Sequence, residues 1–162
     1  MIIKRFPGER SIVSSNNGDV DGELFRQEGV EKTYQDLVKV PVAISKIDLV
    51  VVTKNKKFVI DGWNSLRYYK VGYVRGIKVI ENNLIYGTVS EPVTGLEQAY
   101  KMLDAGRIDV IIDVRTNVKD SVQKFGISGV KILEPAIIKI PVFHYINNSS
   151  FAVDIKCKYI KA

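Results

Sequence analysis

Val71-Gly-Tyr-Val-Arg-Gly-Ile77 is the stretch from which the fold of this chain can be worked out. Its first four residues are β-branched or aromatic apart from one glycine, which is typical of a short buried strand. Gly76 then allows a sharp turn, and apolar residues recur at helical spacing from Ile77 to Leu84. Free backbone N–H groups at a helix start favour an anionic group. The stretch predicts a strand, a turn and a helix, with a candidate cradle at the helix start for an anionic group such as a carboxylate. The same pattern is also typical of a purely structural turn.

The segments on either side continue this alternation of strands and helices. Strand signals occur at residues 43–53, 87–90, 108–114, 130–133 and 137–145. Helix signals occur at residues 61–69, at a capping box from Thr94 to Glu97 that opens a helix ending at Gly106, and at Asn117 before a helix ending at Gly126. Several strands are apolar on both faces, which favours a parallel sheet covered on each side by helices. The chain is therefore predicted to be an α/β protein.

Open sheets of this kind bind ligands beyond the carboxyl ends of their strands. Gly76 and Asp113 follow two predicted strands and would both lie at that edge. Asp113 has a structural alternative, in which its carboxylate caps the turn toward Asn117. At the beginning of the chain, residues 10–17 favour a short helix and residues 19–25 a strand, with Arg26 just past its end.

Composition narrows the functional classes. With 162 residues, 46% hydrophobic and 26% charged, the chain resembles a globular protein, and its apolar runs are too short for a membrane span. The net charge of +6 comes from dispersed basic residues, so no nucleic-acid partner is predicted. Lys54, Lys56 and Lys57 form one cluster, interpreted as a solvated turn, with a phosphate-binding patch as the alternative. Cys157 is the single cysteine, so an internal disulfide is excluded.

Motifs for catalysis and metal binding are missing from the sequence. It contains no phosphate-binding loop, no nucleophile elbow and no Cys/His cluster with metal spacing. His144 is the single histidine and lies in the apolar run PVFHYI, where a packing role is favoured over a catalytic one. We therefore expect no enzyme activity, no cofactor and no metal.

Six segments, in their order and spacing, resemble one known family. They are DGELFR at residues 21–26, KVPVAI at 39–44, Trp63 with Leu66, VGYVRG at 71–76, LDAGRIDVIIDV at 103–114 and PVFHYINNSS at 141–150. Together they look like the extracellular solute-binding proteins of family 3, the type II periplasmic binding proteins of ABC transporters. The resemblance covers about residues 10–150.

The resemblance implies two α/β lobes joined by two crossing segments, with a solute between them. Residues 46–136 would form the second lobe, with its parallel sheet, while residues 1–45 and 137–162 would form part of the first lobe and the crossing segments. The first lobe is expected to be incomplete, because the strand, helix and second strand that open it in the family have no counterpart here. Its uncovered segments are then expected either to pair with the same segments of a second copy in a two-fold homodimer or to be poorly ordered around a stable second lobe.

The resemblance also implies the site residues. Asp113 matches the position that binds a ligand ammonium, and Arg75, Gly76 and Ile77 match the backbone cradle for its carboxylate, although the family often has Thr or Ser in place of Ile77. No residue matches the family's Thr-x-x-Arg carboxylate site. Arg26 is the nearest candidate, with a plain surface arginine as the alternative.

The expected function is the binding of a small polar solute, an amino acid or a related small carboxylate, for the membrane subunits of an ABC transporter. The family implies the periplasm, whereas the N-terminus shows no signal peptide, which taken alone indicates the cytoplasm. Two alternatives remain. One is a small-molecule lyase (dehydratase) of the same fold that uses Asp113 or Glu134 as an acid, and the other is a structural or regulatory fragment that binds nothing.

Overall fold

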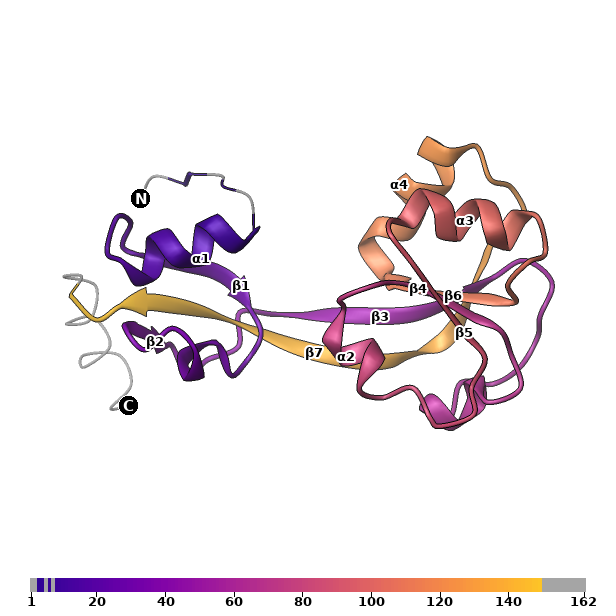
Figure 1. Ribbon diagram of the computed structural model, residues 1–162, viewed down its shortest axis with the longest axis horizontal. Helices are drawn as coiled ribbons and strands as arrows, with labels where there is room; N and C mark the ends of the chain where they lie inside the picture. The colour runs from indigo at the N-terminus through magenta and orange to yellow at the C-terminus, as the bar shows by residue number, and fades with distance from the viewer. Residues whose placement is uncertain (1–2, 5, 7, 150–162) are drawn as a thin grey trace. The chain divides into compact units, whose positions relative to one another are not determined.

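The computed structural model of the chain describes residues 3–4, 6 and 8–149 (Figure 1). The remaining positions, which include Ser150, Cys157 and the end of the predicted first lobe, lie outside the described residues. The chain forms two compact units. Unit 1 comprises residues 1–46 and 140–162, and unit 2 comprises residues 47–139. Among the described helices, none combines the length and the apolar character needed to cross a bilayer.

Unit 1 is built on three strands and one α-helix in its described part. Helix α1 (Gly8–Asn16) precedes β1 (Gly22–Arg26), the 3₁₀ helix η1 (Val30–Lys32) and β2 (Leu37–Lys39). Both β1 and β2 pair antiparallel with the final strand, β7 (Lys131–Asn147). The helix and strand predicted near the N-terminus are therefore confirmed, with shifted ends.

Unit 2 contains most of the regular structure. Its elements are β3 (Ser45–Thr53), η2 (Trp63–Leu66), β4 (Val71–Val74), α2 (Lys78–Glu81), β5 (Ser90–Val93), α3 (Leu96–Asp104), β6 (Val110–Val114) and α4 (Arg115–Phe125). The strand order is β7-β3-β6-β4-β5. The predicted parallel sheet is confirmed for β4, β5 and β6, whereas β3 runs antiparallel to β6 and makes the sheet mixed.

Helices α3 and α4 lie together on one face of the unit 2 sheet (Figure 1). Val50, Val52 and Ile111 face these helices and form a buried cluster with Tyr100 and Leu103. Because side chains alternate along a strand, Val51 and Ile112 point to the opposite face, and both are fully buried there. The sheet is therefore apolar on both faces, as the sequence predicted.

Two predicted helices are much shorter than expected. The helix predicted at residues 61–69 is only the 3₁₀ turn η2, because Asn, Ser, Trp and Tyr have low helix propensity and the Ser65 hydroxyl donates to the Gly62 carbonyl. The helix predicted at residues 77–84 is only α2, since the Asn83 side chain donates to the Val79 carbonyl in competition with the backbone. Trp63 is partly exposed and Leu66 is buried.

Three further local predictions are corrected. The strand expected at residues 87–90 begins only at Ser90, because Gly87 adopts the left-handed conformation (φ +90°) in a turn. The capping box is wrong: the Thr94 hydroxyl lies 3.2 Å from Gln98 Oε1, and Glu97 pairs with Lys101 instead. The two final β runs are one continuous strand, β7. Helix α4 begins at Arg115, ahead of the predicted cap at Asn117.

Candidate functional site

The carboxyl ends of β4 and β6 bring most of the predicted site residues to one edge of unit 2. The two strands are parallel neighbours, with Val71 opposite Val110 and Gly72 opposite Ile111. Arg75 and Gly76 follow the end of β4, and Asp113 lies near the end of β6. The prediction that these residues share one edge of the sheet is therefore confirmed. Their binding of a ligand stays a prediction.

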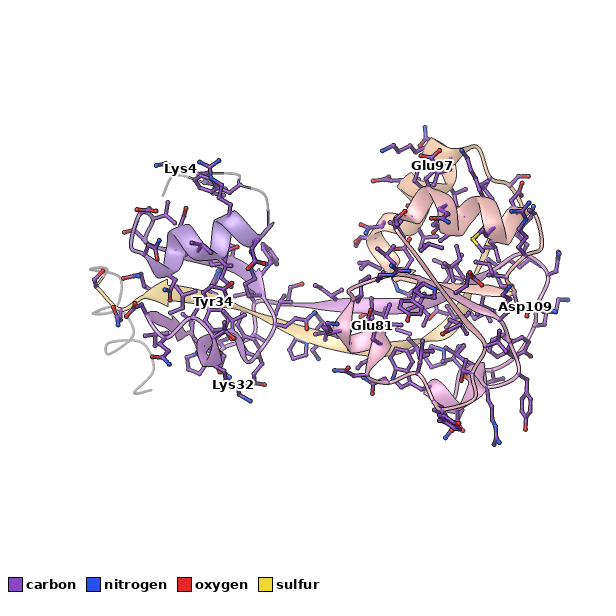
Figure 2. The ribbon with its side chains drawn as sticks, viewed as in Figure 1. Lys4, Lys32, Tyr34, Glu81, Glu97 and Asp109 are labelled. Atoms are coloured by element: carbon purple, nitrogen blue, oxygen red, sulfur yellow. The ribbon has the colours of Figure 1, made fainter. Side chains whose placement is uncertain are left out.

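The predicted cradle after β4 already holds a carboxylate, that of Glu81 on α2 (Figure 2). The Gly76 N–H donates to Glu81 Oε1 at 2.8 Å, and Lys78 Nζ lies 2.7 Å from Oε2. The contact with Lys78 and, to a smaller extent, the hydrogen bond from the Gly76 N–H hold the pKa of the Glu81 carboxyl below its usual value. Gly76 has φ +89°, a conformation that glycine adopts without strain. The turn therefore has the geometry and charge to hold a carboxylate.

Arg75 and Ile77 complete this turn in different ways. The Arg75 side chain is exposed, while its backbone N–H donates to the Val93 carbonyl of β5 at 2.9 Å. Ile77 is half-buried, and its N–H lies 3.5 Å from the Val74 carbonyl. Arg75 therefore offers its guanidinium at the edge, whereas two of the three backbone N–H groups are used within the turn or the sheet.

Asp113 is buried on the side of the sheet that α3 and α4 cover. It is 5% exposed; the Tyr100 hydroxyl donates to its Oδ2 at 3.0 Å and the Val114 N–H to its Oδ1 at 2.7 Å. Burial raises the pKa of the Asp113 carboxyl, and these hydrogen bonds, with one from Asn117, offset part of that rise. Burial likewise raises the pKa of the Tyr100 hydroxyl. Both carboxylate oxygens of Asp113 thus have protein donors.

Arg115, which the sequence did not single out, stands at the same edge as the first residue of α4. Its Nη1 and Nη2 donate to the two Glu134 carboxylate oxygens at 2.6 and 2.8 Å, and its Nε donates to Asp48 Oδ2 at 3.3 Å. The partners lie 67 residues before it and 19 residues after it. No local pattern predicts such distant contacts, although an arginine directly after a predicted ligand-edge strand was a usable signal.

This ion pair bears on the lyase alternative, in which Glu134 was a candidate acid. The Arg115 guanidinium holds the pKa of the Glu134 carboxyl below its usual value. A general acid at neutral pH needs a raised pKa instead. Glu134 therefore has the properties of an ion-pair partner.

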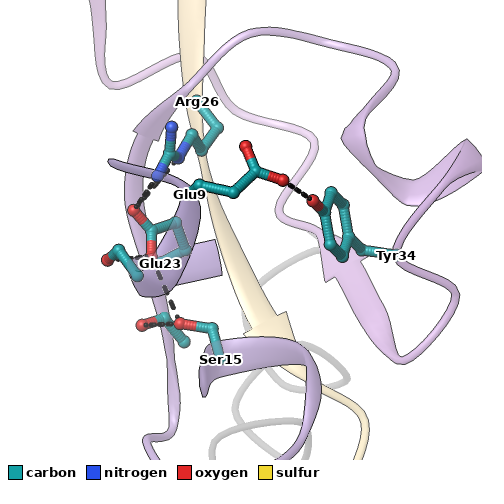
Figure 3. Close-up of polar contacts among 7 residues, drawn as sticks. Glu9, Ser15, Glu23, Arg26 and Tyr34 are labelled. Atoms are coloured by element: carbon teal, nitrogen blue, oxygen red, sulfur yellow. Dashed lines mark hydrogen bonds and ion pairs between the residues drawn. The ribbon is translucent and has the colours of Figure 1, made fainter. Parts of the chain in front are cut away.

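Arg26 belongs to unit 1, where it turns back onto Glu23 (Figure 3). Its Nε donates to Glu23 Oε1 at 3.0 Å, and the Glu23 carboxylate also accepts from Ser11 and Ser15 at 2.6 and 3.2 Å. A bulge in β1 separates the pairs at Glu23 and Arg26, and Phe25 within it has φ +59°. The bulge redirects Arg26, whose role in ligand binding stays a prediction.

Other predicted features have structural partners. Lys54 pairs with Asp104 at 2.5 Å and Lys56 with Asp109 at 2.9 Å, which supports the solvated turn over a phosphate patch. His144 lies in β7 with its ring 6.5 Å from that of Phe25, and its buried Nδ1 has no hydrogen-bond partner among the described residues. No group of metal-ligating side chains occurs in the described part of the chain.

An open groove of about 680 Å³ runs along α3, and it is separate from the predicted site residues. Its lining includes Thr94, Gln98, Lys101 and Arg107, but none of the five predicted site residues. The Glu97–Lys101 ion pair at 2.7 Å lies within it. The groove is therefore a feature of the outer surface of α3.

Comparison with solved structures identifies the fold. The chain matches a probable amino-acid ABC transporter extracellular-binding protein, ytmK, from Bacillus subtilis with a TM-score of 0.70 and 18% identity over 96% of this chain and 69% of that chain. It matches the arginine-bound form of a truncated ArgBP from T. maritima with a TM-score of 0.61 and 16% identity, over 91% of this chain and 68% of that chain. It also matches the GluR0 ligand-binding core from Nostoc punctiforme in complex with L-glutamate with a TM-score of 0.61 and 15% identity, over 91% of this chain and 68% of that chain.

These matches define an α/β fold of the periplasmic binding protein type. The chain spans about two thirds of the length of each of these three structures. No known family profile matches the sequence. No curated protein matches it either.

Proposed function

We propose that this chain binds a small polar solute, an amino acid or a related small carboxylate, as the solute-binding component of an ABC transporter. The observation that carries this proposal is the shared edge of unit 2, where the parallel strands β4 and β6 end at Arg75–Gly76 and at Asp113. Ligands of open α/β sheets bind at such carboxyl ends.

The chemistry of this edge suits a molecule that carries a carboxylate. Arg75 supplies an exposed guanidinium, and the Gly76 N–H already donates to the carboxylate of Glu81. Charge-assisted hydrogen bonds of this kind are stronger than neutral ones. In this proposal the Arg75 guanidinium and the Gly76 N–H bind the carboxylate at the turn that Ile77 completes, and Asp113 attracts the ammonium of an amino acid. The contribution of Arg26 remains a separate prediction.

The structural matches support binding rather than catalysis. Their descriptions name an amino-acid transporter binding protein, an arginine-bound protein and a ligand-binding core with L-glutamate. By analogy, we infer an extracytoplasmic protein that delivers its solute to membrane subunits without chemical change. Pairing of two copies through unit 1 stays a prediction. Light scattering tests it by measuring the molar mass of the protein in solution.

A thermal-shift screen with the standard L-amino acids tests the proposal. A ligand at about 100 times its Kd stabilises the folded state by about 2.7 kcal/mol, which corresponds to a rise of about 5 to 10 °C in melting temperature. Arg75→Gln should weaken the binding of a hit about tenfold or more. Arg107→Gln removes the same charge from an exposed arginine just before β6, at the opposite end of that strand, and should leave binding unchanged. A folded sample that neither the amino acids nor a matching set of small carboxylates stabilises would contradict the proposal.

A further inference from the structure

The guanidinium of Arg115 is oriented so that it binds a carboxylate through two hydrogen bonds. Two parallel N–H···O contacts of 2.6 and 2.8 Å join its Nη atoms to Glu134. The third donor, Nε, faces Asp48 Oδ2 at 3.3 Å and fixes the orientation of the guanidinium plane. This fork geometry is the one in which arginine binds the carboxylate of a free ligand. The Glu134 carboxylate therefore occupies a position that a solute carboxylate would fit.

The two acidic partners of Arg115 differ in how firmly they are held. Glu134 is 61% exposed, and the described structure gives its carboxylate no hydrogen-bond partner other than Arg115. Asp48 is 24% exposed and lies in β3, within the sheet. An exposed ion pair contributes little net stability, because water solvates both charges once the pair opens. Glu134 can leave Arg115 at low cost, whereas Asp48 keeps the guanidinium oriented.

Arg115 also stands where the proposed solute would lie. It directly follows β6, two residues after Asp113, at the edge that Arg75 and Gly76 share. The edge therefore has two exposed or partly exposed guanidinium groups, and Arg115 is the one whose fork already holds a carboxylate.

We propose that Glu134 is a built-in competitor for the solute carboxylate, and that Arg115 is a further specificity-determining residue for that carboxylate beside Arg75 and Gly76, since a carboxylate has lone pairs for more than two donors. This inference rests on the proposed function, since it concerns the same edge and the same class of solute. In the unliganded chain Glu134 fills the fork of Arg115. A solute carboxylate replaces it with two equivalent hydrogen bonds, and Glu134 moves into water.

The proposal makes opposite predictions for the two partners of the ion pair. Glu134→Gln keeps the size of the side chain but removes its charge, so the competitor is weakened and solute affinity rises by up to about fivefold, the range of an exposed ion pair. Arg115→Gln removes the receptor and lowers affinity about tenfold or more. Arg115→Lys keeps the charge without the planar fork, and it also lowers affinity.

Isothermal titration calorimetry with the standard L-amino acids and their C-terminal amides provides the test. Each variant is first checked for a folded far-UV circular dichroism spectrum. Glu97→Gln is the matched control, because Glu97 is an exposed glutamate of unit 2 in an ion pair with Lys101. For an amino acid that binds the wild-type protein, we expect tighter binding to Glu134→Gln, weaker binding to both Arg115 variants and no change with Glu97→Gln. The C-terminal amides lack the competing carboxylate, so their affinity should be the same for Glu134→Gln as for the wild-type protein.

The outcomes separate this inference from the proposed function. If an amino acid binds the wild-type protein and its affinity for Glu134→Gln is equal or lower, Glu134 is not a competitor, while the proposed solute-binding function stands. Arg115→Lys with wild-type affinity overturns the role of the guanidinium fork. Failure of every amino acid to bind both the wild-type protein and Glu134→Gln overturns the inference together with the amino-acid form of the proposed function.

Discussion

The two units of the chain are stabilised in different ways. Unit 2 buries an apolar sheet on both faces, with Val50, Val51, Ile111 and Ile112 all fully inaccessible to solvent. In unit 1 the described apolar cluster is small and consists of Ile12, Leu37, Phe143 and Tyr145, with Val30 and Tyr34 packed against it. Unit 1 is therefore more dependent on polar contacts than unit 2.

Those polar contacts of unit 1 are buried or half-buried and satisfied. Glu23 accepts hydrogen bonds from two serines and Arg26, and the Asn147 side chain donates to the carbonyls of Ser15 and Asn16 at the end of α1. The Tyr145 hydroxyl donates to Glu31 at 2.7 Å. Such networks specify one arrangement, but removal of one partner leaves an unsatisfied group behind. Unit 2 supplies a rigid frame for the proposed edge, and unit 1 has the more easily disrupted interior.

The largest expected effect comes from the apolar core of unit 2. Ile111→Ala should lower the free energy of unfolding by about 3 kcal/mol, because it removes buried methylene groups and leaves a cavity in the sheet. Urea denaturation followed by circular dichroism measures the loss. Val59→Ala, at a position that is 77% exposed, is the control and should change it by less than about 0.5 kcal/mol. Equal effects of the two changes would show that the unit 2 core is not tightly packed.

An intermediate effect is expected in unit 1. Glu23→Gln replaces a carboxylate that accepts from Ser11, Ser15 and Arg26 with an amide that has a single acceptor oxygen, and it should cost about 2 kcal/mol. Amide hydrogen exchange should become faster in α1 and β1 and stay unchanged in β4 and β6. Faster exchange throughout both units would contradict the separation of their interiors.

The smallest effect concerns the buried carboxyl of Asp113 and depends on pH. Its pKa is raised in the folded state, so its contribution to stability is fully present below the unfolded pKa of about 3.9 and is lost as pH rises through the folded pKa. The wild-type protein should therefore become less stable relative to Asp113→Asn as the pH rises from about 4 to about 7. Urea denaturation at the two pH values measures this change. A gain for the wild-type protein over that range would mean that ligand-free Asp113 has a lowered pKa.

Much of unit 2 could be predicted because its signals are local. The run from Val71 to Val74 is the observed β4, and the helix predicted to end at Gly106 is α3, which buries Ala99, Tyr100 and Leu103. The helix predicted to end at Gly126 is α4, and the structure shows Gly126 in the left-handed conformation there. Short helices were overestimated, since spacing alone does not reveal side chains such as Ser65 and Asn83 that compete for backbone groups.

The candidate site likewise has a part that local sequence signals predicted and a part that depends on contacts between distant residues. The sequence by itself determined the α/β class and the positions of Gly76 and Asp113 after two strands, because strand runs, glycine turns and helix periodicity are properties of neighbouring residues. Only the tertiary structure decided that Asp113 is enclosed beneath Tyr100, that Glu81 fills the turn at Gly76 and that Arg115 binds Glu134 and Asp48. The contacts of Arg115 join side chains up to 67 residues apart, and they form only when strand pairing brings β3, β6 and β7 together.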